Sequence, residues 1–189
     1  LRPESVGFIV LATVTPAHPT SPPTAAIVQH RLGLQLEGES GFPCLLVDVS
    51  SACTSFASAL QIAYGLISSG VHTAGLLIGA DVMSRWTNQH DRAVSILLGD
   101  AAAAWVLERT SEGASWFKPE WFYAGGDGSQ ADLIKVPSGG GRAPFPIVEP
   151  LPLSAELICR SPYHLQMDGP KVLQQITRLL TEQVIPAAL

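Results

Sequence analysis

No charged side chain occurs between Asp48 and Asp81, and the hydrophobic pattern changes twice within this stretch. Residues 44–50 form a short, mostly apolar run that is typical of a strand. The residues that follow Cys53 are apolar at helical spacing, and residues 73–80 form a second strand-like run. The pattern therefore predicts a strand, a cysteine, a helix and a second strand, in that order.

The predicted helix is apolar on nearly every side. A helix of this kind is either buried in a protein core or embedded in a membrane. A membrane span is the weaker interpretation, because serine and glutamine side chains interrupt the helix and it is short for a bilayer. We therefore predict a helix buried between layers, in an α/β fold with a largely parallel sheet.

Other elements are predicted upstream of this unit. Residues 6–12 are a continuous apolar run, which is typical of a buried strand. The proline-rich segment 13–23 predicts a loop, because its four prolines are incompatible with regular structure. We expect Thr24 to cap a helix that runs through Leu32 and is closed by Gly33.

The downstream half gives weaker patterns. Residues 94–108 predict a long strand with a bend at its small residues, and the alternating aromatic and polar residues 116–123 predict another strand. A last helix is expected to open at Asp168 or Gly169 and to end at Pro186.

The composition narrows the classes of function. Of 189 residues, 47% are hydrophobic and 14% charged, which favours a folded domain with a large core over disorder. The formal net charge of −5 gives no support to nucleic-acid binding, which requires a basic patch. The first residues lack the basic start and apolar run of a signal peptide. We expect no membrane association.

The three cysteines, Cys44, Cys53 and Cys159, are odd in number and widely spaced. This spacing favours neither a disulfide framework nor a Cys-x-x-Cys metal site. We therefore expect reduced thiols, no metal ion and a cytoplasmic protein.

Cys53 has a special position because it lies where the predicted helix begins. The free N–H groups and the dipole at a helix start favour a negative charge, so a thiol there ionises more easily than a free cysteine. The same N–H groups can hydrogen-bond an oxyanion on a carbonyl under attack. The alternative is that Cys53 is a buried packing thiol, which is the common fate of a free cysteine.

The string of residues 48–56, Asp-Val-Ser-Ser-Ala-Cys-Thr-Ser-Phe, resembles the nucleophile segment of the thiolase-like condensing enzymes. Within them it is most similar to β-ketoacyl-acyl-carrier-protein synthase III. Further segments match that family in the same order, and together they cover most of the chain: residues 12–33, Gly79–Ser84, Asp91–Arg92, Leu98–Ala104, Asp127–Ser129 and Met167–Gly169.

The resemblance implies a layered thiolase-like fold, α-β-α-β-α in the intact protein. This chain would cover much of its first half, in residues 1–110, and the start of its second half, in residues 111–189. It also implies a decarboxylative Claisen condensation of an acyl-CoA primer with malonyl-acyl-carrier protein, in fatty acid or polyketide initiation, through an acyl-Cys53 intermediate.

The resemblance assigns roles to three residues. Cys53 would be the nucleophile, Arg92 would pack on the adenine of coenzyme A, and Gly169 would lie near its pantetheine arm. The alternatives are a surface ion pair of Arg92 with an acidic neighbour and a plain helix start at Gly169. Coenzyme A would be a substrate carrier, so no metal or redox cofactor is expected. The expected partners are acyl-CoA, acyl-carrier protein and a second copy of the chain in a homodimer.

The chain also departs from the family's pattern. The family's catalytic His and Asn have no counterpart among the 189 residues, and we expect none of the five histidines present to be catalytic. The chain is therefore interpreted as an internal fragment that is inactive alone. The alternative functions are a related acyltransferase, a hydroxymethylglutaryl-CoA synthase-like or chalcone synthase-like enzyme, and a non-catalytic heterodimer partner in which Cys53 is silent.

Overall fold

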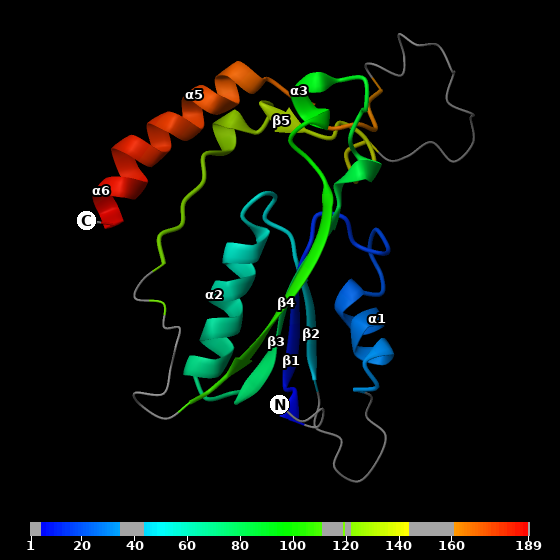
Figure 1. Ribbon diagram of the computed structural model, residues 1–189, viewed down its shortest axis with the longest axis vertical. Coiled ribbons are helices and arrows are strands. Elements are labelled where there is room, and N and C mark those ends of the chain that lie inside the picture. The colour runs from blue at the N-terminus through cyan, green and yellow to red at the C-terminus, as the bar shows by residue number, and fades with distance from the viewer. Residues whose placement is uncertain (1–4, 35–43, 111–118, 120–121, 144–160, 189) are drawn as a thin grey trace. The chain divides into compact units, whose positions relative to one another are not determined.

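The computed structural model describes residues 5–34, 44–110, 119, 122–143 and 161–188 (Figure 1). The chain divides into two compact units: residues 1–82 with 100–120, and residues 83–99 with 121–189. The predicted boundary between two partial halves, after residue 110, stays a prediction.

The first unit is built on a four-stranded sheet in the order β2-β1-β3-β4. Its strands are β1 (Phe8–Ala12), β2 (Leu45–Val49), β3 (Ala74–Val82) and β4 (Asp100–Glu108). Strand β1 pairs in parallel with both of its neighbours, and β4 joins β3 as an antiparallel edge strand. The largely parallel sheet predicted from the sequence is therefore confirmed.

Two helices cover opposite faces of this sheet, α1 (Thr24–Arg31) on one side and α2 (Ser55–Ser68) on the other (Figure 1). Strand β1 explains how one run of apolar residues serves both faces, because successive side chains of a strand point to opposite sides. Phe8 and Val10 pack in the cluster on the α2 side, and Ile9 and Leu11 pack in the cluster on the α1 side.

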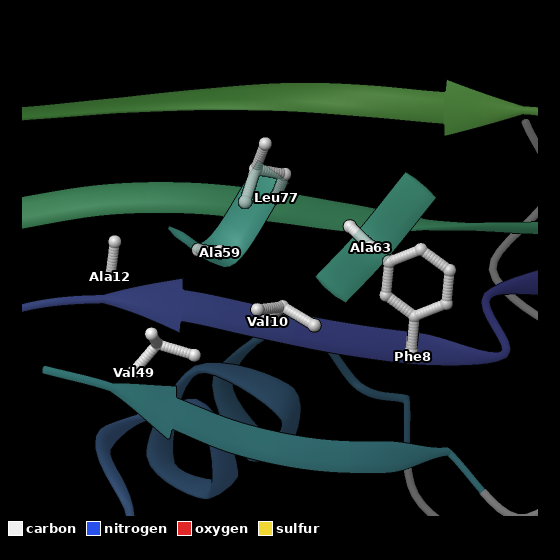
Figure 2. Close-up of a cluster of buried hydrophobic side chains, with 7 residues drawn as sticks. All are labelled: Phe8, Val10, Ala12, Val49, Ala59, Ala63 and Leu77. Carbon is white, nitrogen blue, oxygen red and sulfur yellow. The ribbon is translucent and has the colours of Figure 1, made fainter. Parts of the chain in front are cut away.

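The cluster on the α2 side joins all three parallel strands to the helix (Figure 2). Small residues let α2 lie close to the sheet, since Ala59 and Ala63 are both fully buried. The remaining buried members come from the strands: Phe8, Val10, Ala12, Val49 and Leu77.

Helix α2 is buried on one face rather than on all sides. Ser55, Ala59 and Ala63 are its buried residues, whereas Ile62 is 42% exposed. The prediction of a helix covered all round is therefore wrong for this chain, because the sheet covers only the face that packs on it.

The start of α1 is capped in a way that the sequence did not predict. Thr24 is the first helical residue rather than the cap, and Pro23 occupies the cap position without a side-chain cap bond. The carboxylate of Asp48, on β2, accepts hydrogen bonds from the backbone N–H groups of Thr24 at 2.6 Å and Ala25 at 2.9 Å. An acid from a neighbouring strand thus supplies the acceptor that a helix start needs. Gly33 follows α1 with φ +68°, as expected for a helix-closing glycine.

The other end of α2 is closed by a residue that follows β4. The Arg109 guanidinium donates a hydrogen bond of 2.6 Å to the carbonyl oxygen of Ile67, and its backbone N–H donates to Thr73 at 2.7 Å. Gly70 turns the chain away from the helix with φ +84°. These contacts fix the connection from α2 to β3.

The long strand predicted for residues 94–108 is only partly correct. A short helix, α3 (Arg92–Ser95), occupies its beginning, and the Asp91 carboxylate caps this helix by accepting from the N–H of Ala93 at 2.9 Å. Strand β4 begins at Asp100 and pairs with β3 over its whole length, without the predicted bend. The helix cap formed by Asp91 thus starts a short helix where the apolar run predicted a strand.

The second unit contains short elements and one longer helix. Strands β5 (Ile134–Lys135) and β6 (Gln166–Met167) pair in antiparallel orientation. The same unit contains two short 3-10 helical turns, η2 (Met83–Arg85) and η3 (Gly128–Gln130). Most of the strand predicted for residues 116–123 lies outside the described residues, and Phe122 and Tyr123 belong to no strand.

The last helix, α5 (Gly169–Leu179), opens at Gly169 with Asp168 as its cap, as predicted. Its predicted end is wrong, because a π-helical turn, η4 (Leu180–Val184), leads into α6 (Ile185–Ala188). Pro186 is the second residue of α6, and it directly follows the π-helical turn, whose i→i+5 hydrogen bonds differ from the i→i+4 pattern that a proline interrupts. None of the described helices combines the length and the apolar character needed to cross a membrane.

Candidate active site

Cys53 lies between β2 and α2, in a segment that we call the cysteine turn (residues 50–55), which ends with the first residue of α2. It immediately precedes Thr54, the N-cap of α2, and its side chain is exposed. The predicted position of Cys53 at a helix start is therefore confirmed, and the buried packing alternative is wrong. An exposed thiol beside the free N–H groups of a helix is open to a substrate.

The cysteine turn is held by hydroxyl groups of its own residues. The Ser55 hydroxyl accepts a hydrogen bond from the N–H of Ser51 at 2.8 Å and donates one to the carbonyl oxygen of Ala52 at 2.6 Å. The Thr54 hydroxyl donates to the carbonyl oxygen of Ser51 at 2.8 Å. Ala52 has φ +50°, which is uncommon for a residue other than glycine. This sharp bend brings Cys53 out of the strand before the helix begins.

The adjacent segment, which we call the proline loop (residues 13–23), is tied to the strands on both sides of β1. On β3, Oδ1 of Asp81 accepts from the N–H of Val14 at 2.8 Å and from the hydroxyl of Thr13 at 3.2 Å. At the other end of the loop, Asp48 binds the start of α1 as described above. Both ends of the loop are thus fixed to the sheet edge from which the cysteine turn emerges.

An aromatic pair supports the first turn of α2. The rings of Phe56 and Trp105 lie edge to face, with centroids 5.2 Å apart and planes at 87°. Phe56 also lies over Gly79, where an added Cβ would approach its ring to 3.0 Å. Ser55 therefore directly precedes Phe56, a residue whose ring is firmly packed.

The two described cysteines differ in environment. Cys44 is half-buried at the start of β2, and this burial raises the pKa of its thiol above the usual value. Cys53, at the other end of β2, is exposed. Because the thiolate is the reactive form, Cys53 is the better placed of the two to act as a nucleophile.

Arg92 and Gly169 both lie in the second unit, at helix starts. Arg92 is the exposed first residue of α3, and Gly169 is the first residue of α5. The segments before them are joined where the N–H of Leu165 donates to the carbonyl oxygen of Trp86 at 2.7 Å. Their predicted contacts with coenzyme A stay predictions.

The residues around Gly169 form a small charged cluster. Lys171 Nζ lies 2.8 Å from the Asp168 carboxylate. The backbone N–H of Lys171 also donates a hydrogen bond to this carboxylate. The hydrogen bond with Lys171 lowers the pKa of Asp168, and the hydrogen bond with Asp168 raises the pKa of Lys171. Both groups therefore stay charged at neutral pH. Within the described part of the chain, no cluster of three or more His, Cys, Asp or Glu side chains could hold a metal ion.

The range that contains the cysteine turn matches a known family. The family model described as 3-oxoacyl-[acyl-carrier-protein (ACP)] synthase III matches residues 47–125. A β-ketoacyl-[acyl-carrier-protein] synthase III from Desulfitobacterium hafniense is 32% identical over 187 residues, covering 99% of this chain and 51% of the relative. The chain belongs to the β-ketoacyl-acyl-carrier-protein synthase III family.

Another relative of this chain has a different name. The 3-oxopimeloyl-[acyl-carrier-protein] synthase of Rhodothermus marinus is 43% identical over 145 residues, covering 77% of this chain and 39% of the relative. The chain thus spans about half the length, or less, of these two synthases.

The solved synthase III structures agree with the fold. A crystal structure of a 3-oxoacyl-(acyl-carrier-protein) synthase III superimposes with a TM-score of 0.76 at 28% identity, covering 97% of this chain and 51% of the other. A synthase III from Aquifex aeolicus gives a TM-score of 0.67 at 30% identity, covering 92% and 46%. The predicted thiolase-like α/β fold is therefore confirmed.

Three residues with a place in this site were not singled out for it by the sequence: Ser55, Asp48 and Asp81. The hydrophobic pattern and the family resemblance assign no role to Ser55. Its position two residues after the cysteine, at the helix start, was the available signal, because serine commonly bonds the local backbone there. Asp48 and Asp81 gave a weaker signal, as the only charges that bound a long uncharged stretch.

Proposed function

We propose that this protein is a condensing acyltransferase that uses Cys53 as its nucleophile. The observation that carries the proposal is the exposed Cys53 at the start of α2, within the range matched by the synthase III family. The substrates would be an acyl-CoA primer and malonyl-acyl-carrier protein, in the initiation of a fatty acid or a polyketide. The two cysteines that the structure describes, Cys44 and Cys53, are unpaired, and free thiols fit a cytoplasmic location.

In the first step, the Cys53 thiolate attacks the thioester carbonyl of the acyl-CoA. A bond forms between Sγ and the carbonyl carbon, the bond from that carbon to the coenzyme A sulfur breaks, and coenzyme A leaves as a thiolate that takes up a proton. Splitting the reaction through such an intermediate is nucleophilic catalysis. The backbone N–H of Cys53 would stabilise the oxyanion.

In the second step, malonyl-acyl-carrier protein loses carbon dioxide as its carboxyl carbon–carbon bond breaks. The resulting enolate carbon attacks the acyl-Cys53 carbonyl, and the Cys53 thiolate leaves. Stabilisation of the enolate would come from the His and Asn of the family, which the 189 residues do not contain. Arg92 and Gly169 would hold the coenzyme A moiety, and a second copy of the chain would complete a homodimer.

A second candidate primer follows from the Rhodothermus marinus relative, whose identity of 43% exceeds the 32% of the Desulfitobacterium hafniense relative, although over a shorter stretch. A 3-oxopimeloyl product carries a terminal carboxylate. Because the condensation adds two carbons, that product would require a five-carbon primer with a free carboxylate, such as a glutaryl thioester.

The test uses the full-length protein with acetyl-CoA or glutaryl-CoA, followed by peptide mass spectrometry. We expect one acyl group on Cys53, none on Cys44, and none in a Cys53→Ser variant. The primer that acylates faster identifies the substrate class. Acylation at another residue, or no acylation with any primer, would overturn the proposal and favour a non-catalytic partner role.

A further inference from the structure

Ser55 is nearly inaccessible to solvent although it is polar and lies only two residues from the exposed Cys53. Its exposed fraction is 5%. The hydroxyl accepts from the N–H of Ser51 and donates to the carbonyl oxygen of Ala52, so its single proton is used within the cysteine turn. One buried hydroxyl therefore links both residues that precede the cysteine.

The bonds of the turn point away from the helix rather than into it. A serine or threonine at a helix start usually accepts a hydrogen bond from an N–H inside the first turn. Thr54, the N-cap of α2, makes no such side-chain bond, and its hydroxyl donates back to Ser51. Both hydroxyls thus organise the approach to the helix, and neither occupies the helix N–H groups in front of Cys53.

The backbone of Ala52 has an unfavourable conformation that the hydrogen bonds of the cysteine turn must hold. Its φ of +50° lies in the left-handed region, where a side chain is disfavoured and the surrounding structure must hold the backbone. The carbonyl group of Ala52 accepts both the hydroxyl and the N–H of Ser55, at 2.6 and 3.1 Å. Ser55 is therefore the residue that clamps the strained position directly before Cys53.

We propose that Ser55 is a positioning residue for Cys53: its hydroxyl holds the left-handed bend at Ala52 and so keeps the Cys53 thiol in front of the N-terminus of α2. Ser55 does not touch the substrate and acts only through the turn. The inference deepens the proposed function and rests on Cys53 being the nucleophile.

The test measures the reaction of iodoacetamide with each cysteine of the full-length protein, resolved by peptide mass spectrometry. We expect Ser55→Ala to slow alkylation of Cys53 about tenfold, because small displacements of a reacting group have effects of this order. Alkylation of Cys44 should not change, since a rise there would indicate general loosening of the fold. Ser55→Thr keeps the hydroxyl and should stay within about twofold of the unmodified protein.

A matched control is Ser68→Ala, at the other end of α2, where the hydroxyl also donates to a backbone carbonyl, that of Gly65 at 3.3 Å. It should leave the rate at Cys53 unchanged. With acyl-CoA, Ser55→Ala should lower kcat for acylation while KM stays the same, since the substrate contacts are intact.

Three outcomes would overturn the inference: an unchanged rate at Cys53 in Ser55→Ala, an equal loss in Ser68→Ala, or faster alkylation of Cys44 in Ser55→Ala. The proposed function fails on a different result, namely a Cys53 in the unmodified protein that acyl-CoA does not label. If Ser55→Thr is insoluble, the comparison of Ser55→Ala with Ser68→Ala decides the question.

Discussion

The cysteine turn and the proline loop follow neighbouring parallel strands, but they are stabilised in different ways. The turn closes on itself, through hydrogen bonds between residues three or four positions apart. The proline loop is held by Asp48 and Asp81, whose bonds to the loop and to the start of α1 join residues 24 and 67 positions apart. The cysteine turn is thus specified locally, whereas the proline loop depends on the assembled sheet.

The comparison shows that the two carboxylates do different work. Asp48 uses both oxygens, one for each of two backbone N–H groups. Asp81 uses Oδ1 alone, for the N–H of Val14 and the hydroxyls of Thr13 and Thr15. An asparagine has one acceptor oxygen, so it can replace an aspartate of the second kind but not of the first.

The largest effect is expected for Asp48→Ala. Two N–H groups at the start of α1 would lose their acceptor, at a cost of about 2–3 kcal/mol in the free energy of unfolding. Asp48→Asn should recover little of this loss, because its amide NH₂ would face an N–H donor. Chemical denaturation of the full-length protein measures both changes. Full stability in Asp48→Asn would show that the second oxygen contributes nothing.

A smaller effect is expected at Asp81. Asp81→Ala should cost about 1–2 kcal/mol, because the N–H of Val14 loses its acceptor in a partly buried site. Asp81→Asn should stay within about 0.5 kcal/mol of the unmodified protein, since the one acceptor oxygen is retained. The same denaturation experiment decides this, and equal losses in the two variants would contradict the single-oxygen arrangement.

The smallest effect on stability is expected at Ala52. Ala52→Gly removes the side chain from a left-handed position, which stabilises the folded state, but glycine also gains freedom in the unfolded chain. We expect a net increase of about 0.5–1 kcal/mol in the free energy of unfolding. Thermal unfolding would measure the change. A clear loss of stability would show that the Ala52 side chain is stabilising and that the bend is not strained.

The difference between the two regions also explains what could be predicted from the sequence. The order of strand, cysteine, helix and strand could be predicted from hydrophobic spacing. Cys53 could be selected as the candidate residue because it precedes the predicted helix. These are local properties. The capping of α1 was predicted wrongly for Thr24, because the true acceptor is Asp48, whose proximity depends on the parallel pairing of β1 with β2.

The remaining errors have local causes that hydrophobic spacing does not show. The apolar run before β4 begins as α3 because Asp91 caps it. Pro186 does not end the last helix, because the π-helical turn before it changes the hydrogen-bond pattern that a proline would otherwise interrupt. The role proposed for Ser55 required knowing that Ala52 has a positive φ, which an alanine in a sequence does not indicate.

Arg109 gives helix α2 an electrical asymmetry. The helix has no acidic residue in its first turn and no basic residue in its last turn. The cation at its carbonyl end is Arg109, which belongs to the segment after β4. The negative pole is thereby partly neutralised, while the positive pole beside Cys53 meets no acid supplied by the helix itself. A thiolate at Cys53, or an oxyanion on a bound substrate, would be stabilised by this positive pole.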